Sequence, residues 1–188
     1  IHQDNFYKKI ESNCFFERVT QDDKFFKNIN KLSIRKHKKN IFKLLDQNYK
    51  ISKNTKILEI GCFFGDLLAY LKNKKKCKVF GVEPSKKACK LSTKLYGLNL
   101  ENKTFYKSKY YKISKSTSAM FDIIIFDDVL SWIDRTLILS TIAVTDWLLA
   151  DDGIVFIRDF APSKMFAHPN HHHLKEDIFE SYKALLLL

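Results

Sequence analysis

The segment 121–126, FDIIIF, constrains the fold of this chain more than any other stretch. Five of its six residues are apolar and three isoleucines follow one another, so a strand formed here must be buried on both faces. Such strands lie in the middle of parallel sheets that helices cover on both sides. We therefore expect the rest of the chain to supply further parallel strands and the helices that join them.

The order of the other segments agrees with this expectation. Short β-branched runs alternate with amphipathic stretches, which predicts a doubly wound, mainly parallel Rossmann-like α/β sheet with order 3-2-1-4-5 and helices on both faces. Helices are expected at about 65–73, from Ser85 to Gly97 and from Asp134 to about Leu149. The five strands are expected at 56–60, 78–82, near 104–106, at 121–126 and at 154–158.

Residues 1–50 are expected to form a helical extension that packs on one α/β unit comprising residues 51–188. Ser33 is the expected N-cap of a helix that runs to about Gln47. Its apolar stripe is expected to contain Ile34, Ile41, Leu44 and Leu45, and its solvated face Lys36, Lys38 and Lys39. Little chain follows the fifth strand, so we expect the closing strands to be missing and residues to be absent beyond Leu188 or within 160–188.

The formal charge of +12 raises the question of nucleic-acid binding. Only four of the 33 basic residues are arginine, the residue best suited to bidentate recognition of phosphates and bases. A nucleic-acid partner is therefore possible but not favoured. The sequence contains neither an apolar run of the roughly 18 residues that cross a bilayer nor CxxC spacing among its four cysteines, which predicts a cytoplasmic protein with reduced thiols.

A strand-to-helix turn carries the main chemical signal. It reads Glu59-Ile60-Gly61-Cys62-Phe63-Phe64-Gly65-Asp66, and its two glycines allow a sharp bend and close approach of a ligand. A GxGxxG dinucleotide fingerprint would need glycine at positions 63 and 66, where the chain has Phe63 and Asp66. NAD and FAD are therefore disfavoured, and the absence of GK[ST] disfavours a P-loop.

The turn resembles motif I, [D/E]xGxGxG, of the class I S-adenosylmethionine-dependent methyltransferases, with Phe63 in place of the central glycine. The resemblance implies S-adenosylmethionine as cofactor, S-adenosylhomocysteine as product and no metal. It also implies that Glu59 orients the methionyl group, while Gly61, Cys62 and Gly65 form the turn that holds it. Acidic side chains suit this cofactor because it carries a sulfonium and an ammonium group.

A second acid strengthens the resemblance, because Glu83 follows Glu59 by 24 residues and ends the second strand. A carboxylate there can accept hydrogen bonds from both ribose hydroxyls, with Pro84 beside it; the alternative is a carboxylate that only caps the next helix. The adenine site lacks the acid that many family members have; Ser108 or a backbone group is the candidate substitute, and Tyr110 is a candidate to stack on the base. After the fourth strand, Asp127 and Trp132 are the expected pocket residues.

The chain beyond the fifth strand carries the candidate catalytic residues. His172 or His173 is the expected general base, with Asp159 as orienter or second acid, because an oxygen nucleophile must lose its proton during methyl transfer. Three consecutive histidines cannot all face one point, so no complete metal site is expected from them. This segment resembles a group of small bacterial methyltransferases associated with surface-polysaccharide biosynthesis.

Three functions follow from these patterns. The leading hypothesis is methyl transfer to a small-molecule or sugar-linked oxygen or nitrogen nucleophile. The first alternative is an RNA methyltransferase, which the charge favours but no NPPY-like motif supports. The second alternative is a catalytically inactive domain that binds the cofactor or serves as a partner subunit. The oligomeric state is not indicated.

Overall fold

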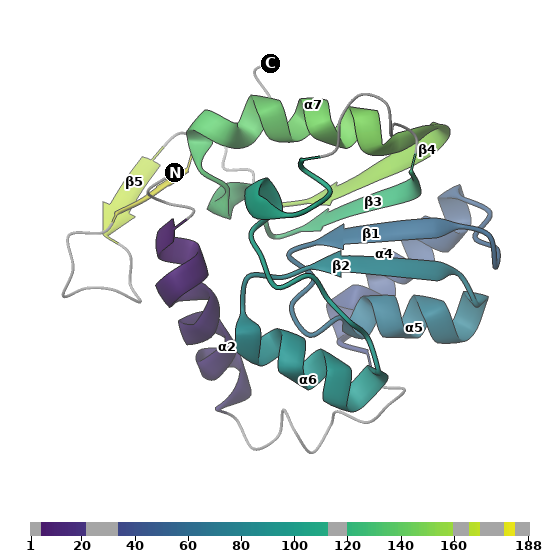
Figure 1. The fold of residues 1–188 in the computed structure, drawn as a ribbon, viewed down its shortest axis with the longest axis horizontal. Coiled ribbons are helices and arrows are strands. Elements are labelled where there is room, and N and C mark those ends of the chain that lie inside the picture. The colour runs from purple at the N-terminus through teal and green to yellow at the C-terminus, as the bar shows by residue number, and fades with distance from the viewer. Residues whose placement is uncertain (1–4, 22–33, 113–119, 160–165, 170–178, 183–188) are drawn as a thin grey trace.

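The computed structural model of the chain describes residues 5–21, 34–112, 120–159, 166–169 and 179–182. At its centre is a four-stranded parallel sheet with the order β2-β1-β3-β4 (Figure 1). The strands are β1 (Lys56–Ile60), β2 (Lys78–Val82), β3 (Phe121–Asp127) and β4 (Leu149–Arg158). Since β2 and β3 lie on opposite sides of β1, the chain changes direction there, and the topology predicts a crevice outside the carboxyl ends of β1 and β3.

Alternation along the strands divides the core between the two faces of the sheet. Ile57 and Ile125 face helices α4 (Lys36–Asn48) and α5 (Asp66–Lys75), while Leu58 and Ile124 face α7 (Ile138–Leu148). Figure 1 shows these helices on opposite sides of the sheet. The expected doubly wound fold with both faces covered is confirmed, and FDIIIF is a central strand with both neighbours in place.

The N-terminal helices lie at the carboxyl ends of the strands (Figure 1). A short π-helix η1 (Tyr7–Glu11) leads into α2 (Ser12–Thr20), which lies beside α6 (Lys86–Tyr96) (Figure 1). The Lys8 ammonium donates to the carbonyl oxygens of Pro84 at 2.9 Å and Asn102 at 2.8 Å, and so ties η1 to the loop after β2. Among the described residues, none of the helices combines the length and apolarity needed to span a bilayer.

The prediction of a strand near 104–106 is wrong. A single parallel bridge joins Val82 to Glu101, after which the chain turns into a 3-10 helix η2 (Phe105–Lys107). Pairing does not extend beyond Glu83, because the Ser85 amide, the next donor on this edge, donates to Glu83 Oε1, and the Lys103 amide donates to the carbonyl of Glu101. The Asn102 side chain instead donates to the carbonyls of Glu83 and Pro84, which turns the chain away from the sheet.

Smaller differences concern element ends. The strand expected at 154–158 begins earlier, since β4 starts at Leu149, and its pairing with β3 shifts register near Phe121. Asp134 caps the 3-10 helix η5 (Arg135–Leu137) that precedes α7, and Leu44 is 48% exposed rather than buried. Ser33 lies outside the described residues. Beyond β4, strands β5 (Phe166–Pro169) and β6 (Phe179–Tyr182) form a separate antiparallel pair.

Candidate functional site

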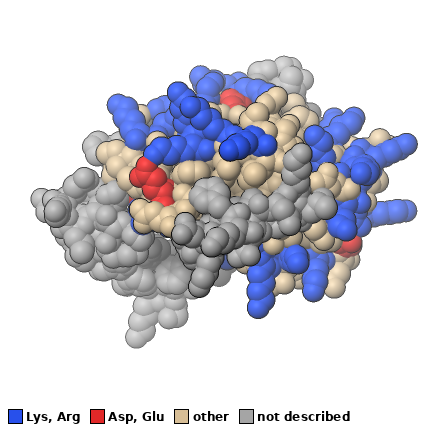
Figure 2. Space-filling model, turned by 90° about the horizontal axis from the view of Figure 1, so that it is seen from below, with Lys and Arg blue, Asp and Glu red and all other residues tan. Residues whose placement is uncertain are grey.

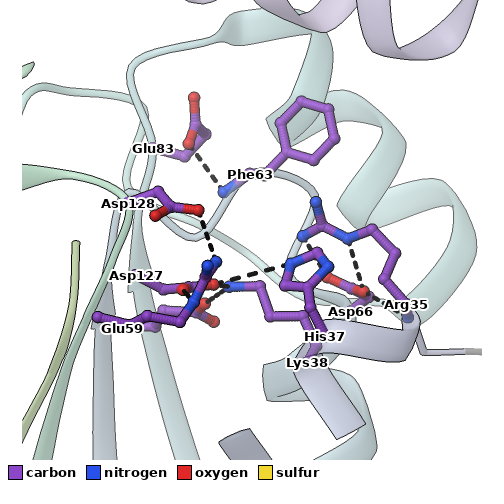
Figure 3. Close-up of polar contacts among 10 residues, drawn as sticks. Arg35, His37, Lys38, Glu59, Phe63, Asp66, Glu83, Asp127 and Asp128 are labelled. Carbon is purple, nitrogen blue, oxygen red and sulfur yellow. Dashed lines mark hydrogen bonds and ion pairs between the residues drawn. The ribbon is translucent and has the colours of Figure 1, made fainter. Parts of the chain in front are cut away.

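The crevice between β1 and β3 is where ligands bind in open α/β sheets, and three charged residues converge on it. Glu59 has the same strand parity as Ile57, and Asp127 the same parity as Ile125, so both acids point to the face covered by α4. Arg158 ends the neighbouring strand β4 on the same face. The carboxyl ends of β1 and β3 thus bring the two carboxylates together (Figure 3), and the Arg158 guanidinium pairs with Asp127.

Lys38 completes this cluster, contrary to the expectation that it would be solvated. It is 2% exposed, and its Nζ lies 2.5 Å from Glu59 Oε1 and 2.5 Å from Asp127 Oδ2. Helical phase explains the difference, because Lys38 falls on the same buried stripe as Ile41 and Leu45, three and seven residues further on. Its side chain therefore extends from α4 toward Glu59 and Asp127 (Figure 3).

The two acids of the crevice differ in how strongly they are compensated. Burial opposes ionisation of Asp127, but Lys38 and Arg158 outweigh it and keep the pKa of Asp127 below its usual value. For Glu59, burial prevails over the attraction of Lys38 and raises the pKa to about 6. Glu59 Oε2 is buried and lacks a hydrogen-bond partner among the described residues, so this carboxylate is only half satisfied.

Asp66, at the end of the motif I turn, binds Arg35 of the same chain. Its carboxylate is buried and accepts hydrogen bonds from the Arg35 backbone amide at 3.1 Å, from Nε at 2.9 Å and from Nη2 at 2.8 Å. The Arg35 side chain forms the planar fork that binds carboxylates best (Figure 3). This pair fastens the beginning of α4 to the beginning of α5, and so holds Lys38 over the crevice.

The motif I turn retains its glycine-like shape although one glycine is replaced. Gly61 and Gly65 have φ of 69° and 73°, and Phe63 also adopts a left-handed φ of 54°. The Phe63 ring is buried against Phe15 and Phe64, away from the pocket described below, while its amide donates to Glu83. The bulky ring therefore packs under α2 and does not line that pocket.

Gly61 is required by crowding as well as by its φ. A Cβ there would lie 2.1 Å from Val129 Cγ2, whereas a Cβ on Gly97, at a similar φ of 64°, would meet no atom within 4 Å. We expect Gly97→Ala to lower the free energy of unfolding by about 1 kcal/mol and Gly61→Ala by about 2 to 4 kcal/mol, because overpacking adds to the same backbone strain. Urea denaturation of both variants measures the difference. Equal losses of unfolding free energy would show that the Val129 side chain moves aside at no cost.

Glu83 lies between the turn and the N-terminus of α6. Its Oε2 accepts from the amide of Phe63 at 2.8 Å and its Oε1 from the amide of Ser85 at 2.7 Å. Burial raises its pKa to about 7 despite these two bonds. Both sequence interpretations are therefore compatible with its position, because the carboxylate holds the local backbone and each oxygen retains a further lone pair.

An apolar pocket opens beside Glu83 at the carboxyl ends of β1 and β2. About 550 Å³ of space, partly open to solvent, lies between Pro84, Gly61 and the aromatic rings of Tyr7, Tyr106 and Trp132. The Tyr7 and Trp132 rings are in contact at 5.4 Å between centroids, so the N-terminal π-helix supplies one wall. No lysine or arginine is among the described residues that line it. Sequence reasoning missed Tyr7, because no motif marks it.

The other expected site residues are placed differently. The Cys62 side chain is fully buried in the core. Ser108 is also buried, and its Oγ is engaged within its own loop, donating to the carbonyl of Phe105 and accepting from the amide of Tyr111. Asp159 accepts from the amides of Leu130 at 2.7 Å and Ser131 at 3.3 Å, which holds the loop that carries Trp132. His172 and His173 lie outside the described residues.

The described part of the chain contains no group of three or more histidine, cysteine, aspartate or glutamate side chains arranged to hold a metal ion. The crevice instead combines acids with the cations Lys38 and Arg158, which compete with a metal for the same carboxylates.

The family of the chain follows from its match to a known domain family. The methyltransferase domain family matches residues 58–155, just over half of the chain, from β1 into β4. The chain belongs to this family. The class I methyltransferase identification based on motif I and Glu83 is thereby confirmed at the level of the family. No curated protein sequence matches this methyltransferase domain.

Solved structures show the same fold at low sequence identity. The 1,6-didemethyltoxoflavin-N1-methyltransferase of Burkholderia thailandensis, solved with bound 1,6-didemethyltoxoflavin and S-adenosylhomocysteine, is 14% identical, with a TM-score of 0.56 over 97% of this chain and 74% of its own. PH0226 of Pyrococcus horikoshii is 19% identical, with a TM-score of 0.51 over 75% of this chain and 63% of its own. PKMT2 of Rickettsia typhi, in complex with AdoHcy, is 27% identical over 55% of this chain, at a TM-score of 0.45. This methyltransferase domain spans only 20% of the length of PKMT2.

Proposed function

We propose that this domain binds S-adenosylmethionine across the crevice and transfers its methyl group to a small-molecule nucleophile. The observation that carries the proposal is the apolar, aromatic-lined pocket at the switch point of the sheet, whose lining residues Val82 and Pro84 flank the buried Glu83. The buried Glu59 directly precedes Ile60, another residue of the lining. This arrangement suits a ligand with an aromatic base, a ribose and a positively charged end.

The residues present fit such a ligand. Trp132 and Tyr106 offer aromatic faces to adenine, and Pro84 packs beside them. Glu83 would accept from the ribose hydroxyls, and the unpartnered oxygen of Glu59 lacks the donor that an ammonium group would bring. A sulfonium cofactor supplies an activated methyl group, so the protein's contribution is alignment of the donor and acceptor.

A small-molecule acceptor is favoured by the charge of the pocket. Lysine and arginine are absent from its described lining, so it offers no partner to the phosphates of RNA. Figure 2 shows lysine and arginine side chains on the face that carries α6. Exposed lysines there are Lys86, Lys87, Lys90 and Lys94, on a helix without a residue in the pocket lining. The Burkholderia thailandensis enzyme, by its name, also methylates a small molecule.

The catalytic assignment of His172, His173 and Asp159 is retained as part of this proposal. Asp159 fastens the loop that carries Trp132, so its replacement would move a pocket wall as well as remove an acid. A histidine remains the side chain best suited to take a proton from an oxygen nucleophile near neutral pH. A double alanine variant at 172 and 173 that retains full turnover would remove both from consideration.

Isothermal titration calorimetry tests the cofactor assignment directly. We expect S-adenosylhomocysteine to bind to the wild-type chain with a dissociation constant in the micromolar range or tighter and NADH not to bind, because the crevice presents acids to the ligand. Failure of both S-adenosylhomocysteine and S-adenosylmethionine to bind would overturn the proposal. Salt-sensitive retention of the chain on RNA, with no small-molecule acceptor found, would favour the RNA alternative.

A further inference from the structure

Lys38 belongs to none of the sequence motifs of this domain, yet its ammonium lies at the centre of the crevice. It approaches from α4, while the two carboxylates that it joins come from β1 and β3. A lysine that is 2% exposed is stabilised only when its charge is paired, and Lys38 is paired twice. It connects the acid of motif I with the acid that follows the neighbouring strand.

We infer that Lys38 is a positioning residue for the cofactor: by binding Glu59 Oε1 it keeps the Glu59 carboxylate ionised and leaves Oε2 for the cofactor's ammonium group. The inference rests on the function proposed above. The contact geometry supports it, because one oxygen of the carboxylate carries the Lys38 bond and the other is buried without a partner. A buried acceptor in this condition requires a donor, and the ammonium of a bound ligand is one.

The charges around Glu59 show why one lysine can decide its state. The groups that face it are Lys38 and Arg35 from the start of α4, Asp66 from α5, Asp127 from β3 and Glu83 from the end of β2. Burial, Asp66 and Asp127 all raise the pKa of Glu59, and Lys38 opposes them through both charge and a hydrogen bond. Arg35 is committed to Asp66 through a bidentate pair.

Removal of the Lys38 charge would therefore let the pKa of Glu59 rise further above about 6, so a larger fraction of Glu59 would be neutral at a given pH. A neutral carboxyl group cannot form an ion pair with an ammonium group. The loss should affect only ligands that carry the amino-acid end of the cofactor. It should also be reversed as the pH is raised and Glu59 ionises again.

The test compares Lys38→Met, which keeps the length of the side chain without its charge, with Lys39→Met, an exposed neighbour on the same helix. Calorimetry at pH 7.5 uses two probes: S-adenosylhomocysteine and 5′-methylthioadenosine, which lacks the amino-acid end. We expect Lys38→Met to bind S-adenosylhomocysteine at least tenfold more weakly than the wild type, and methylthioadenosine within twofold of it. Lys39→Met should match the wild type for both probes.

Two further measurements separate positioning from a general structural role. Between pH 7 and 8.5 the Lys38→Met affinity for S-adenosylhomocysteine should recover toward the wild-type value. In a Glu59→Gln background, where the carboxylate is already absent, Lys38→Met should cause no further loss. Should Lys38→Met fail to fold, Lys38→Arg retains the positive charge, and its affinity and pH profile should follow those of the wild type.

The outcomes distinguish this inference from the proposed function. Wild-type chain that binds neither probe would overturn the proposed function. A different result would overturn only the inference: the wild-type chain binds both probes, and Lys38→Met binds S-adenosylhomocysteine as tightly as the wild type or more tightly. Lys38 would then be a competitor of the ligand or a structural counterion. An equal loss of both probes, or an additive loss in the Glu59→Gln background, would also overturn it.

Discussion

Glu83→Gln is expected to weaken S-adenosylhomocysteine binding by about 10- to 100-fold, because a charged acceptor is worth about 1.5 to 3 kcal/mol per hydrogen bond. The glutamine side chain keeps one acceptor oxygen, but its NH2 group faces one of the two backbone amides, of Phe63 or Ser85, that now donate to the carboxylate. Calorimetry measures the affinity after circular dichroism has verified the fold. Unchanged affinity would show that Glu83 holds only the backbone, as a capping carboxylate does.

The pH dependence of binding gives a second readout of the same group. Burial raises the pKa of Glu83 to about 7, so the fraction that is ionised falls as the pH decreases from 8 to 6. We expect the wild-type affinity to fall by up to about tenfold over this range, and the component with a midpoint near 7 to vanish in Glu83→Gln. Glu17→Gln, at a half-exposed position on α2, is the matched control and should leave the profile unchanged.

The same shift has a defined effect on stability. The folded-state pKa of about 7 lies above the ordinary value of 4.5, so the folded protein binds the proton more tightly than the unfolded chain does. The ionised Glu83 therefore destabilises the fold above pH 7, and this cost disappears as the pH falls from 7 toward 4.5. Ligand-free Glu83→Gln should lack this component in its urea denaturation series.

Asp127→Asn is expected to lower the free energy of unfolding by about 3 to 5 kcal/mol, because it leaves buried cations partly uncompensated. Asp127 pairs with Lys38 inside the protein and with Arg158 at its edge, and its side chain is 2% exposed. The adjacent Asp128 offers a matched control, since it also pairs with Arg158 but is 57% exposed. Asp128→Asn should cost no more than about 1 kcal/mol.

Salt and pH distinguish the two variants further. Screening by 1 M NaCl should remove the effect of Asp128→Asn and leave most of that of Asp127→Asn, whose pairs lie partly out of reach of solvent ions. Since the pKa of Asp127 lies below its ordinary value of 3.8, the carboxylate stabilises the fold above that pH, and its contribution is lost as the pH falls below it. Equal losses in both variants would show that burial does not strengthen the Asp127 pairs.

Much of the fold follows from the sequence because local patterns and tertiary environment agree there. The isoleucines of β3, the turn from Glu59 to Gly65 and the caps Ser85 and Gly97 each determine a local structure that the neighbouring elements also require. The order of these segments in turn restricts the sheet to a doubly wound form, so the crevice could be located before any contact was known.

The misassigned strand at 104–106 depended on a contact that is not encoded locally. Its residues are compatible with a strand. What prevents one is the neighbouring segment, where the Ser85 amide donates to the Glu83 side chain, together with the Asn102 side chain that turns the chain. Pairing depends on the donors of a partner that is distant in sequence. Local propensity contains no information about that partner.

The sequence by itself determined the methyltransferase motifs and the two acids, Glu59 and Glu83, because spacing along the chain fixes which strand end each acid occupies. Only the tertiary structure decided how these acids are balanced. Lys38 lies on the buried, mainly apolar stripe of α4, although its charge predicts a position in solvent. Its pairing with Glu59 and Asp127 joins three elements that are far apart in the chain. Such a contact is set by how α4 packs on the sheet, and hydropathy alone assigns a lysine to solvent.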